Sequence, residues 1–128
     1  MDRKVVHFLA LDATNFLFIN SLNELWKISS GPTLTKLMTF TGEVIRNAHL
    51  DSTSTHIYLL TSVSTKGIFY IKKYRISDGV LMDSIMLNPY FAWSVKYMMV
   101  TNQGVAVFCN GFNYGTSGFS HRGYIFDI

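Results

Sequence analysis

The sequence predicts an all-β protein built from about three tandem four-stranded antiparallel meanders, and three observations support this prediction. Short apolar runs, rich in β-branched and aromatic residues, alternate along the 128 residues with turns of Gly, Asn, Asp, Ser and Thr. A recognisable motif recurs 48 residues after its first appearance. The turns also come too often, and β-branched residues are too frequent, for helices of ten or more residues.

The stretch 56–87 shows the pattern most clearly, because three strands follow one another in it. Residues 57–60 form a short apolar run between Ser and Thr residues, which is typical of a buried strand. Residues 68–76 alternate with a period of two, which favours a strand over a helix. Asp78 and Gly79 supply turn chemistry, and residues 80–87 return as a further strand.

The same order of strands appears before and after this stretch. We expect the first strand of each unit at residues 7–12, 46–51 and 96–102. The second strand is expected at residues 16–21, 57–62 and 105–110. These second strands are nearly continuous apolar runs, as expected of strands that are covered on both faces.

The third strand carries the most specific repeat. WKISSG at residues 26–31 and YRISDG at residues 74–79 share an aromatic residue, a basic residue, Ile, Ser, a small polar residue and Gly. Residues 126–128 resemble the start of a third copy. A fourth strand is expected at residues 34–40 and 80–87, so the chain would hold eleven strands in one domain, 1–128, with units at about 4–42, 43–90 and 91–128.

Four-stranded meanders that repeat every 40 to 50 residues resemble the blades of a β-propeller. The resemblance covers nearly the whole chain and is carried by the short apolar strand, the aromatic-basic-Ile strand and the polar-Gly turn described above. It implies sheets that stack face to face. Because propellers have at least four blades, three units imply an incomplete ring that further blades or chains complete. A neighbouring chain could also add the missing fourth strand.

Composition favours a non-enzymatic structural or protein-interaction module. Apolar residues make up 48% of the chain and charged residues only 15%, so a monomer would have difficulty covering its surface and a large interface is expected. We expect protein partners or self-association. The net charge of +3 is mild and its Lys and Arg residues are scattered, so no nucleic-acid partner is expected.

Catalytic and metal-binding patterns are weak. The four histidines, His7, His49, His56 and His121, lack the spacing of metal ligands, and the sequence holds no nucleophile elbow or phosphate loop. We therefore expect no enzyme activity, no metal and no cofactor. Asp12, Asp51 and Asp78 fall at turns, where local hydrogen bonding explains them.

Two segments on one predicted rim are candidate sites for a ligand or partner. The first is residues 111–123, interpreted as a long glycine-rich loop with aromatic and basic residues, and the second is residues 88–93. The candidate residues are Tyr90, Phe91, Trp93, Asn113, Tyr114, Phe119, His121 and Arg122. Two alternatives stay open: a glycan- or peptide-binding module that uses the 111–123 loop, and one segment of a propeller enzyme whose catalytic residues lie elsewhere.

The sequence gives limited information about the compartment. A single cysteine, Cys109, excludes an internal disulfide framework. The N-terminus does not resemble a signal peptide, and no apolar run approaches the 18 residues that span a bilayer. If Met1 is the native start, we expect a cytoplasmic protein.

Overall fold

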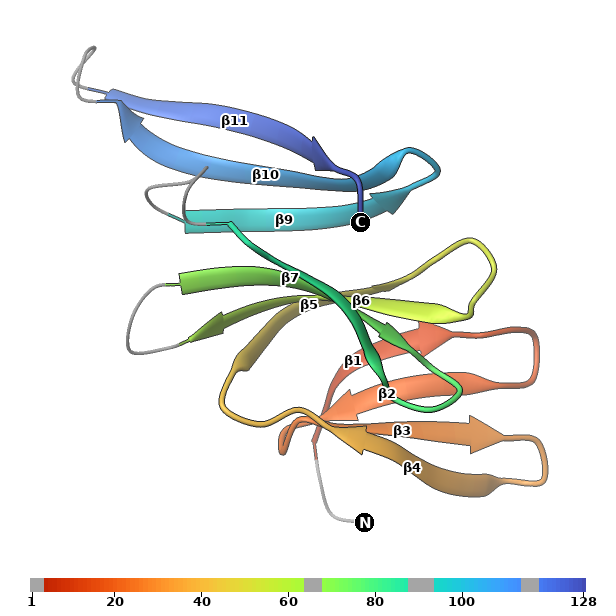
Figure 1. The fold of residues 1–128 in the computed structure, drawn as a ribbon. Helices are drawn as coiled ribbons and strands as arrows, with labels where there is room; N and C mark the ends of the chain where they lie inside the picture. The colour runs from red at the N-terminus through yellow and green to blue at the C-terminus, as the bar shows by residue number, and fades with distance from the viewer. Residues whose placement is uncertain (1–3, 64–67, 88–93, 114–117) are drawn as a thin grey trace.

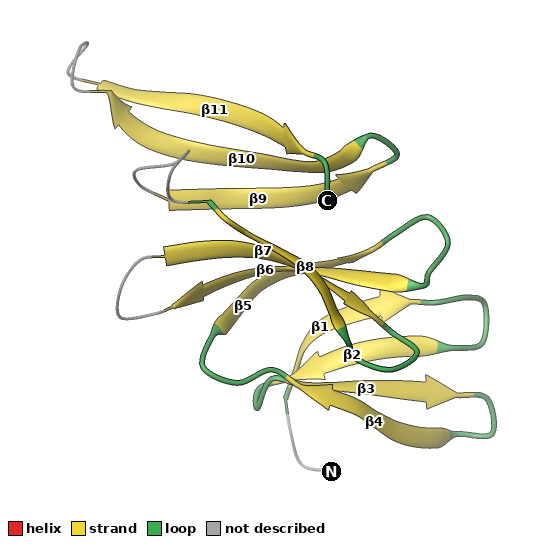
Figure 2. Cartoon of the chain, viewed as in Figure 1, coloured by secondary structure: helices red, strands yellow, loops and turns green. Residues whose placement is uncertain are grey.

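The computed structural model describes residues 4–63, 68–87, 94–113 and 118–128, of which 94–96, 109–113 and 118–122 are described by their backbone alone. These residues form eleven strands and no helix (Figure 2). The predicted all-β class is therefore confirmed. No helix among them is long and apolar enough to cross a membrane.

The strands form three antiparallel sheets in chain order. Sheet 1 contains β1 (Val5–Ala10), β2 (Phe16–Asn20), β3 (Glu24–Ser29) and β4 (Thr33–Thr39). Sheet 2 contains β5 (Val44–Leu50), β6 (His56–Val63), β7 (Ile68–Arg75) and β8 (Leu81–Met86). Sheet 3 contains β9 (Ser94–Thr101), β10 (Gly104–Asn113) and β11 (Gly118–Phe126).

Each sheet is a meander in which neighbours along the chain pair with each other, and the three sheets are stacked one on the next (Figure 1). None of them closes into a barrel or a ring. The prediction of three tandem meanders, the last with three strands, is confirmed. We call the face of a sheet that points toward the preceding sheet its leading face, and the face that points toward the following sheet its trailing face. The leading face of sheet 1 and the trailing face of sheet 3 are the faces that point away from sheet 2.

The third strand of the last unit differs from the prediction. The sequence motif places its start at Phe126, whereas β11 runs from Gly118 and ends at Phe126. The long loop expected at residues 111–123 is also wrong, because β10 and β11 pair continuously from Val105↔Phe126 to Asn113↔Gly118. Glycine content suggested a loop, but glycine also adopts the extended backbone of a strand, and a paired hairpin satisfies more backbone hydrogen bonds than an open loop.

Gly123 shows why one of these glycines lies inside a strand. A Cβ atom at this position would come within 3.0 Å of the Phe108 ring, which lies across the Gly123 backbone. The two residues are directly paired between β10 and β11. The glycine therefore makes room for an aromatic ring on the next strand.

The two hydrophobic cores lie between the sheets, and β6 contributes to both. Ile57 and Leu59 belong to the core between sheets 1 and 2, while Tyr58 and Leu60 belong to the core between sheets 2 and 3. Because successive side chains of a strand point to opposite faces, a strand between two layers is apolar on both faces, as residues 57–60 of β6 are, although the same strand also buries Thr61 and Ser62. Burial of each of the aliphatic side chains among them, Ile57, Leu59 and Leu60, stabilises the fold by about 1.5–3 kcal/mol.

The first strands of the three sheets lie next to one another, since β1 contacts β5 and β5 contacts β9. His7 on β1 reaches the carbonyl oxygen of Ile45 on β5, with 3.3 Å between Nε2 and oxygen. The fourth strands, β4 and β8, are largely exposed. The stack is thus closest at the first strands and more open at the fourth.

An apolar residue after each fourth strand closes the junction with the next sheet. Phe40 donates its backbone N–H to Asn23 and is buried in the core between sheets 1 and 2. Leu87 donates its backbone N–H to Phe69 and is buried in the core between sheets 2 and 3. The two junctions therefore repeat the same connection.

Candidate interaction surfaces

The strand register identifies one equivalent row of residues in each sheet. Each row joins a first-strand residue, its second-strand partner and the third-strand aromatic residue paired with that partner. The rows are Phe8–Phe18–Trp26 in sheet 1, Leu50–Ile57–Tyr74 in sheet 2 and Val100–Val105–Phe126 in sheet 3. The repeat seen in the sequence at Trp26 and Tyr74 is thus also a repeat in three dimensions.

Two of the three rows pack against the preceding sheet. The row of sheet 2 contributes to the core shared with sheet 1. The row of sheet 3 contributes to the core shared with sheet 2. In sheets 2 and 3, which both have a preceding sheet, this row is therefore the centre of the leading face.

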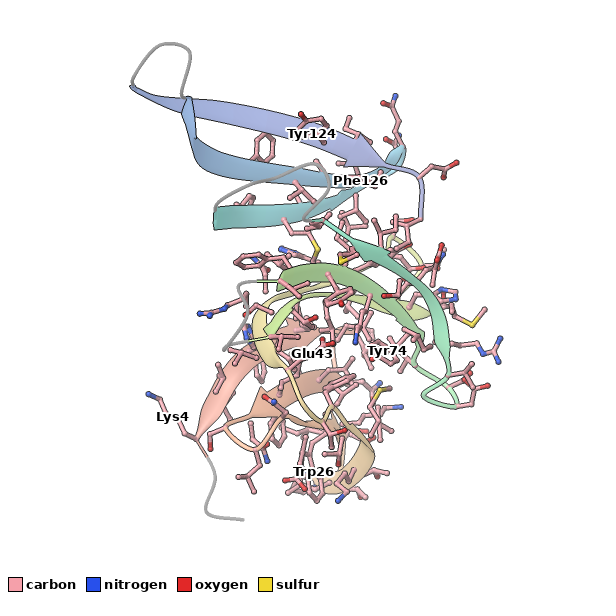
Figure 3. The ribbon with its side chains drawn as sticks, turned by 60° about the vertical axis from the view of Figure 1, so that its left-hand side comes forward. Lys4, Trp26, Glu43, Tyr74, Tyr124 and Phe126 are labelled. Atoms are coloured by element: carbon pink, nitrogen blue, oxygen red, sulfur yellow. The ribbon has the colours of Figure 1, made fainter. Side chains whose placement is uncertain are left out.

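The row of sheet 1 lies on a leading face that no preceding sheet covers. Phe8 is 58% exposed, although it is equivalent to Leu50, which packs in a core. Leu34, on the same face at the outer strand, is also exposed. Figure 3 shows Trp26 at the end of the stack, whereas Tyr74 lies between sheets 1 and 2.

Aromatic rings organise this free leading face. The rings of Phe8 and Phe16 stack with 5.4 Å between their centroids, and those of Phe18 and Trp26 are nearly parallel at 6.5 Å. Pairs of this kind add about 0.5–1.5 kcal/mol beyond the area they bury. Ordered aromatic rings on an uncovered sheet are a preformed apolar surface.

The trailing face of sheet 3 is the second uncovered face. Strand alternation places Met99 of β9, Ala106 and Phe108 of β10 and Ile125 of β11 on this face, with Tyr97 at its β9 edge, where the Tyr97 ring also reaches His49 of sheet 2. Ile125 is 60% exposed, and all of these residues except Ala106 are exposed. The stack therefore exposes apolar side chains at both ends, and on the leading face of sheet 1 these lie beside the Lys36–Glu24 ion pair, at 3.2 Å.

Polar contacts at the internal junction show how a covered leading face is completed. Glu43, in the connection between β4 and β5, accepts a hydrogen bond from the Asn23 side chain through its backbone oxygen at 2.7 Å. Its carboxylate forms an ion pair with Lys72 on the leading face of sheet 2, and both side chains are mostly buried. Figure 3 shows Glu43 and Tyr74 in this junction. One glutamate thus ties sheet 1 to sheet 2.

Asp51 and Asp12 hold the turns after β5 and β1. The Asp51 carboxylate accepts hydrogen bonds from the backbone N–H groups of Thr55 and His56 at 2.9 and 3.1 Å. Partial burial acts to raise the pKa of Asp51, but hydrogen bonds from His56, Thr53 and Thr55 outweigh it and lower the pKa to about 2. Asp12 accepts from the N–H groups of its own turn in the same way. The turn roles expected from the sequence are confirmed.

His49 lies at the junction of β5 and β9, and its ring meets the ring of Tyr97 edge-on at 6.2 Å between centroids. Burial lowers its pKa, a hydrogen bond with the Met98 backbone acts to raise it, and the charge of His7 acts to lower it. Burial dominates, so the neutral imidazole is favoured.

No group of three His, Cys, Asp or Glu side chains suited to a metal occurs among the described residues.

The structure describes four of the eight candidate residues, and those by their backbone alone. Tyr90, Phe91, Trp93 and Tyr114 lie outside the described residues. The backbone of Asn113 lies at the end of β10, and Phe119, His121 and Arg122 lie within β11. The register pairs His121 with Asn110 and Arg122 with Cys109.

Sequence reasoning did not find the free leading face of sheet 1. Its signal is present in the third-strand motif, because Trp26 occupies the position of Tyr74. Recognising that equivalence as a shared face requires the register of β2, β3, β6 and β7, which the sequence does not specify.

No family model, curated protein or solved structure matches this chain.

Proposed function

We propose that this protein is a non-enzymatic structural module, a partial β-propeller whose two end faces associate with further blades or chains. One observation carries the proposal. The leading-face row that is covered in sheets 2 and 3 recurs in sheet 1 as Phe8, Phe18 and Trp26, where no sheet among the described residues covers it; Phe18 is itself buried, and Phe8 is 58% exposed. A face equivalent to two packed faces is best explained as a third packing face.

The energetic argument follows from the composition of the two faces. Exposed apolar side chains such as Phe8 and Ile125 gain about 25 cal/mol for each Å² of apolar surface removed from water. Single exposed apolar residues are ordinary, but contiguous apolar faces mark interaction sites. Closely spaced first strands and open fourth strands support the wedge-shaped stacking of propeller blades.

Molar mass and dye binding of the isolated chain test this proposal. The double variant Phe8→Asp, Ile125→Asp places a charge on each free face, and Met82→Asp is the matched control. Met82 is 45% exposed on β8, the outer strand of the sheet whose two faces are already covered. All three proteins should retain the far-UV circular dichroism of the unmodified chain, because the substituted side chains are exposed.

We expect the unmodified chain and Met82→Asp to show either a molar mass above 14.6 kDa by light scattering or strong binding of an apolar fluorescent dye. The double variant should be monomeric and bind at least several-fold less dye. An unmodified chain that is monomeric and binds no dye would contradict the proposal, because its end faces would then not be available apolar surfaces.

A further inference from the structure

We infer that the free leading face of sheet 1 binds the free trailing face of sheet 3 from a second copy of this chain. The inference rests on the proposed function and deepens it by naming the partner and the two surfaces. The resulting contact is head to tail: each copy uses one face toward its predecessor and the other toward its successor.

The polarity of the internal junctions supports this pairing. In both junctions the leading row of one sheet meets the trailing face of the sheet before it. Tyr74 and Phe126 occupy the same register position in sheets 2 and 3, and both pack toward the preceding sheet. The chain has one free leading face and one free trailing face. A second copy can therefore cover either of them with its own face of the other kind. This contact continues the packing that the chain already uses twice.

The two faces also differ in the side chains that they present. The leading face of sheet 1 presents large rings, led by Phe8 and Trp26. The trailing face of sheet 3 combines the exposed side chains of Met99, Phe108 and Ile125 with one small residue, Ala106, while the Phe108 ring takes the space beside Gly123. Large side chains set against small ones interdigitate better than two rows of rings.

The internal junction between sheets 1 and 2 supports the same reading. There, the aliphatic residues Leu17, Ile19 and Leu25 of a trailing face receive a leading row that contains the ring of Tyr74. Trp26 is the equivalent ring in sheet 1. In that junction the Tyr74 ring also meets the Phe40 ring edge-on, at 5.1 Å between centroids, so the row packs against a mainly aliphatic face with one ring beside it.

Complementation between two blocked variants tests the pairing. Phe8→Asp blocks the leading face only, and Ile125→Asp blocks the trailing face only. Under the head-to-tail contact, neither variant has a partner for its intact face, so each is monomeric alone. An equimolar mixture restores one intact leading face and one intact trailing face, and should form a 1:1 complex of about twice 14.6 kDa.

Leu34→Asp and Met99→Asp form a second pair on the same two faces. Each replaces an exposed side chain, so the test remains available if a variant of the first pair fails to fold. Met82→Asp should associate like the unmodified chain. Association of either blocked variant with itself would overturn the inference, because a like-face contact would then be in use.

A mixture of the two blocked variants that stays monomeric would also overturn the head-to-tail inference. Dye binding then separates this inference from the proposed function. If the unmodified chain is monomeric but binds the dye, and the face variants lose that binding, the end faces serve a different protein partner and only the second copy is excluded. If the unmodified chain is monomeric and binds no dye, both proposals fail.

Discussion

At the scale of single residues, Gly104 is fixed by both its backbone and its surroundings. Its φ is +135°, and a Cβ atom would lie 2.3 Å from the carbonyl oxygen of Phe126. Gly31 is a matched control, because its φ is +111° but nothing lies within 4 Å of its Cβ position. The pair therefore separates backbone strain from a steric clash.

We expect Gly31→Ala to lower the free energy of unfolding by about 1–2 kcal/mol, the cost of a left-handed backbone at a residue with a Cβ atom. Gly104→Ala should lower it by several kcal/mol, because the clash with the Phe126 backbone adds to that strain. Denaturant unfolding of the two variants measures the difference. Equal losses would show that β11 moves away from Gly104 without cost.

Local chemistry of this kind is visible in the sequence only where a residue acts on its own turn. Asp12 and Asp51 were identified as turn residues, since an aspartate after an apolar run bonds the backbone next to it. Gly123 was assigned to a loop, because its reason for being glycine is the Phe108 ring on another strand. A residue that depends on a cross-strand neighbour needs the register before it can be interpreted.

At the scale of elements, the junction of β5 and β9 contains a partly buried histidine, His49, beside Tyr97. Burial lowers the pKa of His49 in the folded chain, so the unfolded chain binds the proton more readily. The contribution to stability is complete above the unfolded pKa of about 6.5 and is lost as the pH falls below it. Tyr97, Tyr58 and His7 are the titratable neighbours from β9, β6 and β1.

We expect the free energy of unfolding to fall between pH 7.5 and 5.5, by about 1.4 kcal/mol for each unit by which the pKa is lowered. His49→Gln should show a flatter dependence over the same range, because glutamine takes up no proton. Denaturant unfolding at several pH values measures both slopes. Identical slopes would mean that His49 titrates alike in the folded and unfolded chains.

The strands themselves were largely predictable. Apolar runs that are buried on both faces, such as the β6 run, identify a strand between two layers from composition alone. The second hairpin of sheet 3 was not predictable, because its glycine and serine residues are equally compatible with a loop. There, cross-strand pairing decides the outcome.

At the scale of the whole molecule, the three sheets stack in one direction, each with its leading face against the trailing face of the sheet before it. The two ends of the stack are therefore different faces, and both expose apolar side chains. Low charge leads us to expect an interface, and the register locates two uncovered faces, the leading face of sheet 1 and the trailing face of sheet 3, where we propose one. The sequence could not locate them, since the two faces of a strand differ in role only after the stacking order of the sheets is known.

Methionine oxidation tests the association of these faces within a single sample. Met99 on the free trailing face and Met82 on β8 are 42% and 45% exposed, so peroxide should oxidise them at similar rates in a monomer. At high protein concentration, our account predicts that Met99 is oxidised several-fold more slowly than Met82, and that the rates converge on dilution. Equal rates at every concentration, measured by peptide mass spectrometry, would contradict it.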